Sequence, residues 1–596
     1  MKPKQFFSAL AYSIKTCFTV SPVRYVTVIL LNFVIYAAPF AVTAIWKITL
    51  DQLSLNITGR ILLLIAAYIG VTAAGNCAES VKIYLEHIVE ENAVIKADED
   101  FIKQAACVGM EYFDNPEKTD ELSLIGRKTR QVFFLQQSFW EITLGIVAII
   151  SAIVLVAQNI PWAIAILLAA YIPKIIIDTK NQKRVYEDFD ATETERRKQE
   201  YYVQTVTEKR YAQDVRLYGI IGMLLNRYRA SYQVVRKLME RQHRKETVGV
   251  VIAMLFGWFG IGGVLIITII AAVNGKITIG DVQYDFGLAT QLAERIDYAS
   301  VTLAYIASKV LAVSTHIAFI NKQQDAVGKR VYNKDDNPVI EFRDVSFRYP
   351  TSEKDVLSNV SFTIGPNERV ALVGINGAGK TTIVKLLLGL YPPTGGKIYV
   401  NGVDIREYDP DSLHRIVSVM FQNHQEYAFS VADNITMFSD RNDDALRDAM
   451  KESGISDMIA SWECGADTCI THRFDAQGKE LSGGQAQKLA LARSLYRRDA
   501  KLYIMDEPSA SLDAEAEDEL FRNLLNLSRD ASALFITHRM SMCASADRVI
   551  LIEDGRVLEN GTHTELLAEN GRYAYLYGLQ AQQYTDGLAN GGEMNE

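Results

Sequence analysis

The stretch that decides the fold runs from Val370 to Thr382 and reads Val-Ala-Leu-Val-Gly-Ile-Asn-Gly-Ala-Gly-Lys-Thr-Thr. Its four apolar residues predict a buried strand, and Thr382 to Leu390 predicts a helix directly behind a glycine-rich loop. Such a loop curls backbone N–H groups around nucleotide phosphates, and the positive end of the following helix faces them. The sequence therefore predicts a phosphate site at Gly374, Asn376, Gly377, Ala378, Gly379, Lys380, Thr381 and Thr382.

A second buried strand is predicted from Lys501 to Met505, and two acids, Asp506 and Glu507, follow it directly. In the glycine-rich loop, Lys380 is expected to reach the terminal phosphates, and the Thr381 hydroxyl suits Mg²⁺. At the strand end, one carboxylate can hold the magnesium shell and another can polarise water. Two adjacent acids are a weak signal alone, but behind a phosphate loop they indicate nucleotide hydrolysis.

The N-terminal half of the chain has a different composition from the C-terminal half. The mean hydropathy of +0.03 averages long apolar runs before about Lys309 with an ordinary soluble α/β pattern after about Asn337. A helix needs about 20 apolar residues to cross the hydrocarbon core of a membrane. Six segments are predicted to cross, of which the fourth is short and contains Pro173: Tyr25 to Ile45, Ile61 to Tyr84, Phe134 to Val156, Trp162 to Ile177, Val248 to Val273 and Ile277 to Val310.

The connections between these segments predict their orientation. The second and third segments, and the fourth and fifth, are joined by long stretches rich in Lys and Arg, which stay in the cytosol. Both termini are then cytosolic, and Met1 to Ser21 reads as an amphipathic helix on the membrane surface. Asp114 to Pro116 and Thr207 to Gly219 interrupt the long stretches. We expect these tips to touch the C-terminal domain, with purely solvated helical hairpins as the alternative.

Charge and cysteine content narrow the function classes. The net charge of −9 comes without a basic stripe, so nucleic acid is not an expected partner. The six cysteines are scattered along the chain, which favours reduced thiols in the cytosol. Cys464, Cys469 and His472 fit no common zinc spacing, so we expect an ordinary surface loop there.

A third motif stands just ahead of the second strand, where residues 481–485 read Leu-Ser-Gly-Gly-Gln. It matches, letter for letter, the signature motif of ATP-binding-cassette exporters, and the chain resembles a half-transporter of that family. The closest resemblance is to type IV, B-family-like exporters of the peptide or multidrug subgroup. The similarity covers about Val339 to Leu579 and includes four further family elements: Tyr349 as the adenine-stacking aromatic, Gln422 as the Q-loop, Asp513 in the D-loop and His538 as the switch histidine.

This resemblance implies a set of roles for the matched residues. Catalysis would fall to Glu507, His538 and Gln422, and Mg²⁺ would be held by Thr381, Gln422 and Asp506. The signature residues Ser482, Gly483, Gly484 and Gln485 would bind the γ-phosphate of ATP held by a second subunit, so one chain cannot complete a site. The intact motifs slightly favour a homodimer, and a heterodimer stays open. ATP and Mg²⁺ are the implied cofactors.

The implied fold is a multidomain membrane protein, with an all-α six-helix transmembrane domain followed by an α/β P-loop nucleotide-binding domain. Residues 474–480, before the signature, lack the usual exporter sequence, which makes the contact between this loop and the coupling segments less certain. The predicted divisions are an amphipathic elbow helix at 1–22, the transmembrane domain at 23–325, a linker at 326–337, the nucleotide-binding domain at 338–582 and a C-terminal tail at 583–596.

The expected function is ATP-driven export of a peptide, lipid or amphipathic small molecule by a dimer in a bacterial cytoplasmic membrane. Membrane lipid and the transported substrate are the other expected partners. An importer built on the exporter fold and a non-transporting regulatory subunit are the alternatives. A soluble cassette ATPase acting in translation or DNA repair conflicts with the six apolar segments.

The sixth segment carries a polar stripe at helical spacing. Five residues recur at steps of three and four and share one helix face: Gln291, Glu294, Tyr298, Thr302 and Tyr305. An ionisable group inside a membrane is costly in lipid, so this face is expected to line a substrate pathway. Arg295 and Asp297 lie beside the stripe, and the alternative is that these charges pair across helices.

Overall fold

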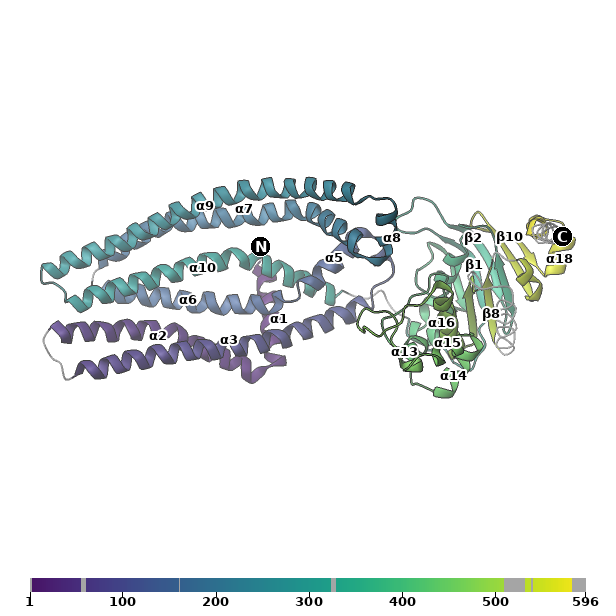
Figure 1. Cartoon of the computed structure of the whole chain (residues 1–596), viewed down its shortest axis with the longest axis horizontal. Helices are drawn as coiled ribbons and strands as arrows, with labels where there is room; N and C mark the ends of the chain where they lie inside the picture. Colours follow the sequence, from purple (N-terminus) through teal and green to yellow (C-terminus); the bar gives the residue numbers. More distant parts are fainter. Residues whose placement is uncertain are drawn as a thin grey trace. The chain divides into compact units, whose positions relative to one another are not determined.

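The computed structural model describes residues 3–54, 60–159, 161–322, 328–508, 531–537 and 540–580. The chain divides into two compact units. The helical unit comprises Met1–Ala106 and Glu121–Lys322, and the sheet unit comprises Cys107–Asp120 and Gln323–Glu596. Each unit has its own core and is described by itself below (Figure 1).

The helical unit consists of long helices that run up and down in pairs (Figure 1). The three helices that end at Ser54, Asn159 and Val273 do so at the same end of the unit, which we call the hairpin end. A short connection leaves neighbouring helices antiparallel, which explains this pairing. The helices are α1 (Pro3–Val20), α2 (Pro22–Ser54), α3 (Ile61–Ala105), α5 (Pro116–Arg127), α6 (Gln131–Asn159), α7 (Pro161–Thr207), α8 (Lys209–Leu217), α9 (Ile221–Val273) and α10 (Ile279–Ile320).

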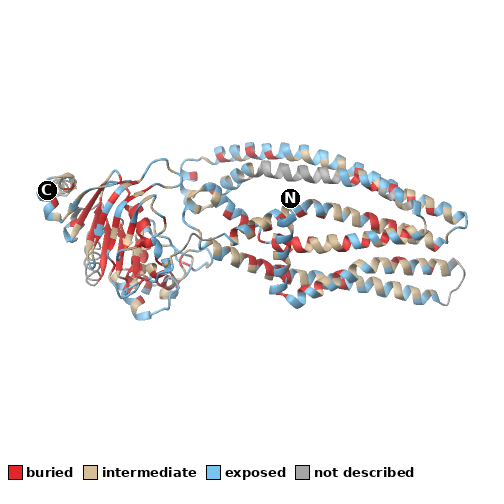
Figure 2. Cartoon of the chain, turned by 180° about the vertical axis from the view of Figure 1, so that it is seen from behind, coloured by how far each residue is buried: buried red, intermediate tan, exposed pale blue. Residues whose placement is uncertain are grey.

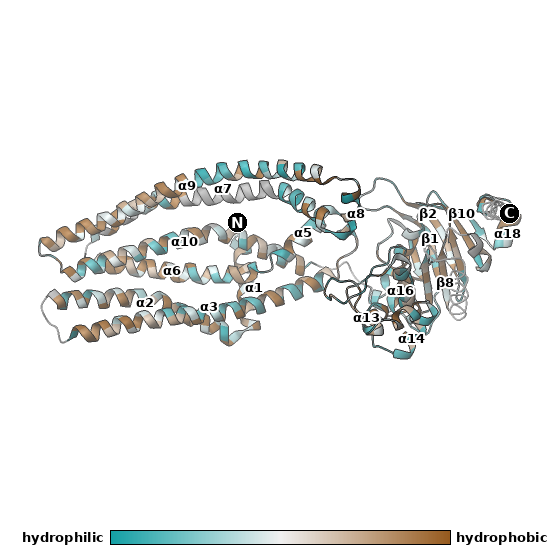
Figure 3. Cartoon of the chain, in the orientation of Figure 1, coloured by the Kyte–Doolittle hydropathy of each residue, from teal (hydrophilic) through white to brown (hydrophobic). Residues whose placement is uncertain are grey.

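Among the described residues, five helices are long and apolar enough to cross a membrane, judged by length and composition. They are α2, α3, α6, α9 and α10, which carry five of the six predicted segments. The fourth segment falls short of this standard, because the apolar part of α7 covers only Ile164–Ile177 before charged residues begin. Helix α9 is hydrophilic in its first half and apolar towards Val273, so it extends well beyond an apolar span (Figure 3).

The sheet unit is built on a six-stranded sheet with the order β10-β9-β3-β8-β7-β6. All neighbours are parallel except β10 and β9, which form an antiparallel edge. Strands β7 and β8 are buried along their whole length, as parallel strands covered on both faces are (Figure 2). The strands are β3 (Arg369–Val373), β6 (Val417–Met420), β7 (Leu502–Asp506), β8 (Ser532–Ile536), β9 (Arg548–Glu553) and β10 (Arg556–Gly561).

A second, antiparallel sheet has the order β2-β1-β4-β5. Phe342 of β1 and Phe362 of β2 stack across it with their ring centroids 4.5 Å apart. Both rings belong to a core that also contains Leu372 of β3, which joins the two sheets. The strands are β1 (Ile340–Phe347), β2 (Leu357–Ile364), β4 (Gly395–Val400) and β5 (Val403–Asp404).

Helices complete the sheet unit on the faces and at one side of the larger sheet. Helix α4 (Glu111–Asp114) belongs to this unit although it lies between α3 and α5 in the sequence. The other helices are α11 (Lys380–Leu387), α12 (Pro410–Arg415), α13 (Val431–Thr436), α14 (Asp443–Glu452), α15 (Ser456–Ala460), α16 (Gly483–Tyr496) and α18 (His563–Ala568), with 3-10 turns at Ile405–Glu407, Gly465–Asp467 and Met540–Ser545.

Part of the predicted linker at 326–337 is packed into the sheet unit. Tyr332 is buried in its main core, and its backbone N–H donates to Ser412 Oγ at 3.0 Å. Its hydroxyl also donates to the Asp336 carbonyl at 3.1 Å. The packed structure of the C-terminal domain therefore starts before residue 338. The predicted tail at 583–596 lies outside the described residues.

Candidate functional site

The predicted phosphate loop lies between β3 and α11, as the sequence pattern required. The Lys380 ammonium donates to the Gly374 carbonyl at 2.8 Å and to the Ile375 carbonyl at 3.0 Å. These bonds fold the lysine back over the loop, and burial lowers the pKa of Lys380. Gly379 has a φ of 101°, and a Cβ there would lie 2.6 Å from Leu357 Cδ2, so only glycine fits.

Asp506 and Thr381 connect the phosphate loop to strand β7, which lies two positions from β3 in the sheet. Asp506 is the last residue of β7, and its side chain is almost completely buried. Thr381 Oγ1 donates to Asp506 Oδ2 at 2.9 Å. Burial raises the pKa of Asp506, while the hydrogen bond from Thr381 and the charge of Lys380 oppose that rise. Two of the three residues predicted to hold a metal ion, Thr381 and Asp506, are thus adjacent.

Glu507 and Gln422 form a second polar pair beside Asp506. Glu507 has a φ of 53°, a left-handed conformation that is uncommon for a residue with a side chain. Its backbone N–H donates to the Ile536 carbonyl at 3.0 Å, which holds this turn against β8. Gln422 Nε2 donates to Glu507 Oε2 at 2.8 Å, so the Q-loop amide and the acid meet although 85 residues separate them. A strained backbone that aims a carboxylate is typical of a functional site.

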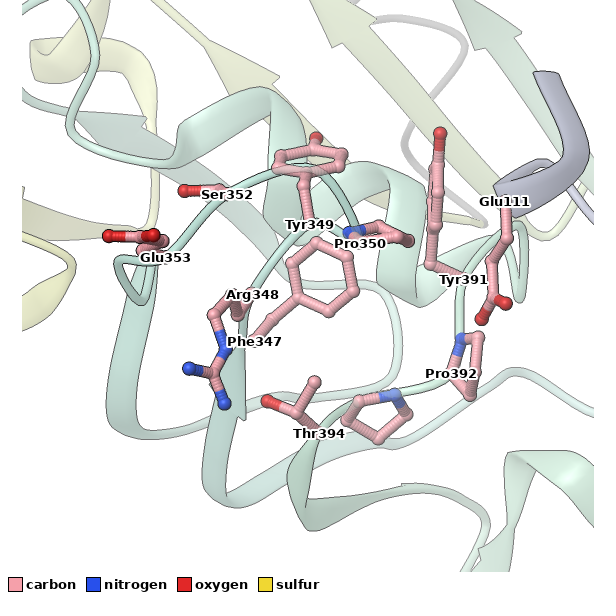
Figure 4. A pocket seen from close by; sticks show the side chains of 11 residues that line it. Glu111, Phe347, Arg348, Tyr349, Pro350, Ser352, Glu353, Tyr391, Pro392 and Thr394 are labelled. Atoms are coloured by element: carbon pink, nitrogen blue, oxygen red, sulfur yellow. The ribbon is translucent and has the colours of Figure 1, made fainter. Parts of the chain in front are cut away.

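Tyr349 lies just past β1 in an aromatic cluster. Its ring packs edge-on against Phe347, with centroids 4.9 Å apart, and against Tyr391, with centroids 5.5 Å apart. Its hydroxyl lies 3.2 Å from Thr382 Oγ1, which ties it to the start of α11. An open pocket of about 530 Å³ lies beside this cluster, and Arg348, Pro392 and Glu111 are among its lining residues (Figure 4).

The signature residues begin helix α16. Ser482 is the N-cap residue and forms a capping box with Gln485: Gln485 N–H donates to Ser482 Oγ at 3.4 Å, and Ser482 N–H donates to Gln485 Oε1 at 2.8 Å. Ser482 and Gly483 are exposed, so this positive helix end is open to an anion from outside the chain. Further along α16, Gln487 Nε2 donates to the Pro508 carbonyl at 2.6 Å, next to Glu507.

Two predicted site residues, Asp513 and His538, lie outside the described residues. The described residues of the predicted nucleotide site fall into two groups, with the phosphate loop, Tyr349, Asp506, Glu507 and Gln422 in the first and the signature helix in the second. The first group combines a lysine, a hydroxyl, two carboxylates and an amide around a glycine-rich loop, which suits a nucleotide triphosphate and a divalent cation.

Comparison with known proteins agrees with this geometry. The family model described as ABC transporter matches residues 357–510. The chain carries the ATP-binding domain of an ABC transporter. Its ATP-binding half follows a helical membrane half in one polypeptide, so it is a fused half-transporter and a multi-pass membrane protein.

Three relatives illustrate how far the sequence similarity extends. The transporter is 29% identical to the subtilin transport ATP-binding protein SpaT of Bacillus subtilis over 525 residues, which cover 84% of this chain and 82% of SpaT. An ATP-dependent lipid A-core flippase of Paraburkholderia xenovorans is 38% identical over 41% of this chain and 40% of its own length. The glucan export protein NdvA of Rhizobium johnstonii is 35% identical over 52% and 53%. The chain therefore matches about half or less of the length of the flippase and of NdvA.

A solved structure shares the fold over nearly the whole chain. It is a bacterial Atm1-family ABC exporter with ATP bound, and it superimposes with a TM-score of 0.81 at 22% sequence identity. The match covers 94% of the transporter and 99% of that chain. Both halves of the transporter thus have the fold of an ABC exporter.

The polar stripe of α10 divides into packed and exposed residues. Gln291 Nε2 donates to Thr43 Oγ1 of α2 at 2.6 Å and to the Pro39 carbonyl at 3.2 Å. Thr302 is buried, whereas Glu294, Tyr298 and Tyr305 are exposed on the single chain. Gln291 and Thr302 thus pack within the chain, and the other three residues face outward from it.

The charges beside the stripe take partners on other helices. Asp297 forms an ion pair with Lys174 of α7, and the Arg295 guanidinium lies 4.3 Å from the centre of the Tyr36 ring. The alternative of charges pairing across helices is therefore realised for Asp297, whereas Arg295 takes an aromatic partner. Neither of them belongs to the stripe itself.

Two residues that the sequence analysis did not single out form contacts with residues that it did. Glu141 of α6 accepts a hydrogen bond from Tyr298 at 2.7 Å, and it is the only ionisable residue in the apolar segment Phe134 to Val156, which was the missed signal. In the sheet unit, Tyr391 donates to Asp114 Oδ2 at 2.7 Å. That bond confirms the contact predicted for the segment Asp114 to Pro116, and no motif pointed to Tyr391.

We predict that Thr381→Val destabilises the nucleotide-free protein by about 1–3 kcal/mol, because it removes the hydroxyl that donates to the buried Asp506 carboxyl. Thr381→Ser keeps a hydroxyl and is the matched control. The measurement is the melting temperature of both variants in detergent without nucleotide. Equal melting of Thr381→Val and the wild-type protein would show that the bond contributes nothing to stability.

Proposed function

We propose that this transporter is an ATP-driven exporter that works as a dimer in a bacterial plasma membrane. The observation that carries the proposal is the pair of contacts from Thr381 to Asp506 and from Gln422 to Glu507 around the phosphate loop. A hydroxyl, two carboxylates and an amide that meet beside the phosphate loop support binding of the terminal phosphates of ATP there. The exporter relatives SpaT and NdvA and the shared exporter fold support the direction of transport.

The residues divide the work of hydrolysis. Thr381, Asp506 and Gln422 offer hydroxyl, carboxylate and amide oxygens, which are the donors that Mg²⁺ prefers, and Mg²⁺ would neutralise charge on the phosphates. Lys380 and the loop residues from Gly374 to Thr382 hold the phosphates. Tyr349 stacks on the adenine ring. Glu507 orients or deprotonates the attacking water, and His538 contacts the γ-phosphate.

The nucleotide site is completed by a second chain. Ser482, Gly483, Gly484 and Gln485 present the open N-terminus of α16, which suits the γ-phosphate of ATP held by the partner. Asp513 contributes to the same interface. The catalytic motif residues of the family are intact at every described position, which favours a homodimer. The Lys- and Arg-rich stretches place both termini and the ATP-binding half in the cytosol, so the hairpin end faces outward.

The substrate is proposed to be a peptide, lipid or amphipathic molecule that meets the stripe on α10. Glu294, Tyr298 and Tyr305 are exposed on the single chain, and Glu141 adds a second carboxylate within hydrogen-bond distance of Tyr298. Gln291 and Thr302 belong to the same face but support the helix packing. Carboxylates and phenols together favour a substrate with a cationic or amide-rich head and an apolar body.

The direct test is ATP-dependent transport in inside-out membrane vesicles, with Glu507→Gln as the inactive variant. We predict that Glu507→Gln keeps ATP binding and lowers turnover roughly 10²–10⁴-fold, because the amide keeps the shape and cannot accept the proton of water. Substrate should enter wild-type vesicles only. Wild-type rates in the variant would overturn the role of Glu507, transport in the opposite direction would favour an importer, and hydrolysis without transport would favour a regulatory subunit.

A mixture of two inactive chains tests the shared site. Lys380→Ala removes the phosphate lysine and Ser482→Arg blocks the signature, so each homogeneous dimer should be inactive. A mixed dimer then has one site with both lesions and one with neither, and we predict that ATPase activity partly returns. Normal activity of either homogeneous variant would contradict the shared-site arrangement. The control is Ser482→Ala, which removes the hydroxyl without adding bulk to the site.

The stripe is tested with Glu294→Gln and Glu294→Ala. We predict that both variants lose the stimulation of ATPase activity by substrate and keep basal ATPase activity and melting temperature, because Glu294 is exposed on the single chain. Transport, basal and stimulated ATPase activity and thermal melting are measured together. A collapse in stability, or unchanged stimulation, would show that Glu294 does not line the pathway. Asp297→Asn, at the packed ion pair, is the contrasting variant, and it should lower stability.

A further inference from the structure

A buried carboxyl group lies near the hairpin end of the helical unit and has no role in the proposed export cycle. Asp285 is in the second turn of α10, and its side chain is 0% exposed. Oδ1 accepts one hydrogen bond, from Asn159 Nδ2 at the end of α6, at 3.1 Å. Oδ2 is buried and has no hydrogen-bond partner among the residues that the structure describes.

The nearest charges are already engaged with one another. Asp281, one helical turn earlier, pairs with Lys47 of α2 at 2.5 Å and accepts the backbone N–H and the hydroxyl of Thr278 at 2.9 and 3.0 Å. Lys47 also lies 5.2 Å from the centre of the Tyr284 ring. Among the described residues, the titratable groups in this region are thus Asp281 and Tyr284 of α10 and Lys47 and Asp51 of α2.

The other surroundings of this part of α10 are neutral. Helix α6 contributes Asn159 to Asp285 itself. The next residues on the helix, Leu288 and Ala289, are completely buried in an apolar cluster with Val156 of α6 and Val264 of α9. A carboxylate with one donor, one unpartnered oxygen and a like charge one turn away is unfavourable in such surroundings, whereas a neutral carboxylic acid is tolerated.

We propose that Asp285 is a proton-binding site that couples opening of the hairpin end to the pH outside the membrane. The carboxyl keeps its proton while α2 and α10 are packed together. When they part, water reaches the group, its O–H bond breaks, the electron pair stays on the carboxylate and the proton passes to water. Closure reverses the step. The proposal rests on the proposed export function, in which the hairpin end faces outward and opens during each cycle.

The contacts between α2 and α10 show what must separate. Asp51 accepts the backbone N–H of Gly280 at 3.0 Å, and a Cβ on Gly280 would lie 2.5 Å from the Lys47 carbonyl. With the Lys47–Asp281 pair and the bond from Gln291 to Thr43, these contacts hold the two helices together on both sides of Asp285. They include few apolar groups, so water can replace them when the helices part.

The sign of the pH effect follows from linkage. The packed arrangement binds the proton more tightly than the open one, so acid outside favours the packed arrangement. As the outer pH rises, the proton is lost and the open arrangement gains. One proton per chain changes the open-to-packed ratio by at most about tenfold per pH unit.

The test measures the distance between the outer ends of α2 and α10 in the full chain. Spin labels are placed at Leu53→Cys and Ile279→Cys, both exposed, after replacement of the six native cysteines. Distances are recorded in lipid nanodiscs across pH, with and without ATP. We expect ATP to increase the separated fraction, and this fraction to rise several-fold per pH unit over part of the range. Asp285→Asn should abolish the pH dependence, because the amide cannot lose a proton.

Asp281→Asn is the matched control, since it breaks the ion pair with Lys47 and leaves Asp285 in place. It should change the separated fraction and keep the pH dependence. A flat profile in the wild-type chain, or an unchanged profile in Asp285→Asn, would overturn the proton site and leave the export function standing. No separation with ATP at any pH would contradict alternating access itself. If Asp285→Asn does not fold, the wild-type profile and infrared detection of a carboxylic acid lost on ATP addition decide the question.

Discussion

The hydrogen bond between Thr381 and Asp506 is the contact on which the nucleotide site depends. The phosphate loop leaves β3 and the acids leave β7, with β8 between them in the sheet. Parallel pairing aligns the carboxyl ends of these strands, so residues 125 positions apart meet at one edge. The Asp506 carboxyl is buried there and accepts a hydrogen bond from Thr381 in the first turn of α11. The position of Glu507, one residue later, follows from this arrangement.

The helical unit obeys the opposite constraint, because its exterior is apolar and its polar groups must find partners inside or between chains. Asp297, Arg295 and Gln291 find them on α7 and α2, and these residues fix the packing of α10. Glu294 and Tyr305 remain exposed on the single chain and are available to a partner chain or a substrate. We therefore propose that function in this half lies with the polar residues that are not used in helix packing.

The sequence predicted most of the nucleotide site, because its motifs place residues by local spacing and each motif lies at the end of a strand. Lys380, Thr381 and Asp506 meet where the pattern put them. The bond from Gln422 to Glu507 could be expected only from family resemblance, since 85 residues separate the two. Tyr391 and Glu141 were missed because their partners, Asp114 and Tyr298, come from other parts of the chain. The fourth predicted segment, Trp162 to Ile177, corresponds to the shorter apolar stretch Ile164–Ile177 of α7.

Asp506 and Asp285 are both buried, but they have different hydrogen-bond partners and neighbouring charges. Asp506 has a hydroxyl donor and a nearby lysine, and the proposed Mg²⁺ would lie beside it. Among the described residues, Asp285 has an amide on one oxygen and no partner on the other, and the nearby Lys47 pairs with Asp281. A buried acid without an opposite charge or enough hydrogen-bond donors is tolerated either as a neutral carboxylic acid or in a conformation that the protein leaves again. A carboxyl at the moving end of a membrane helix satisfies both conditions, since the motion that hydrates it also allows it to ionise.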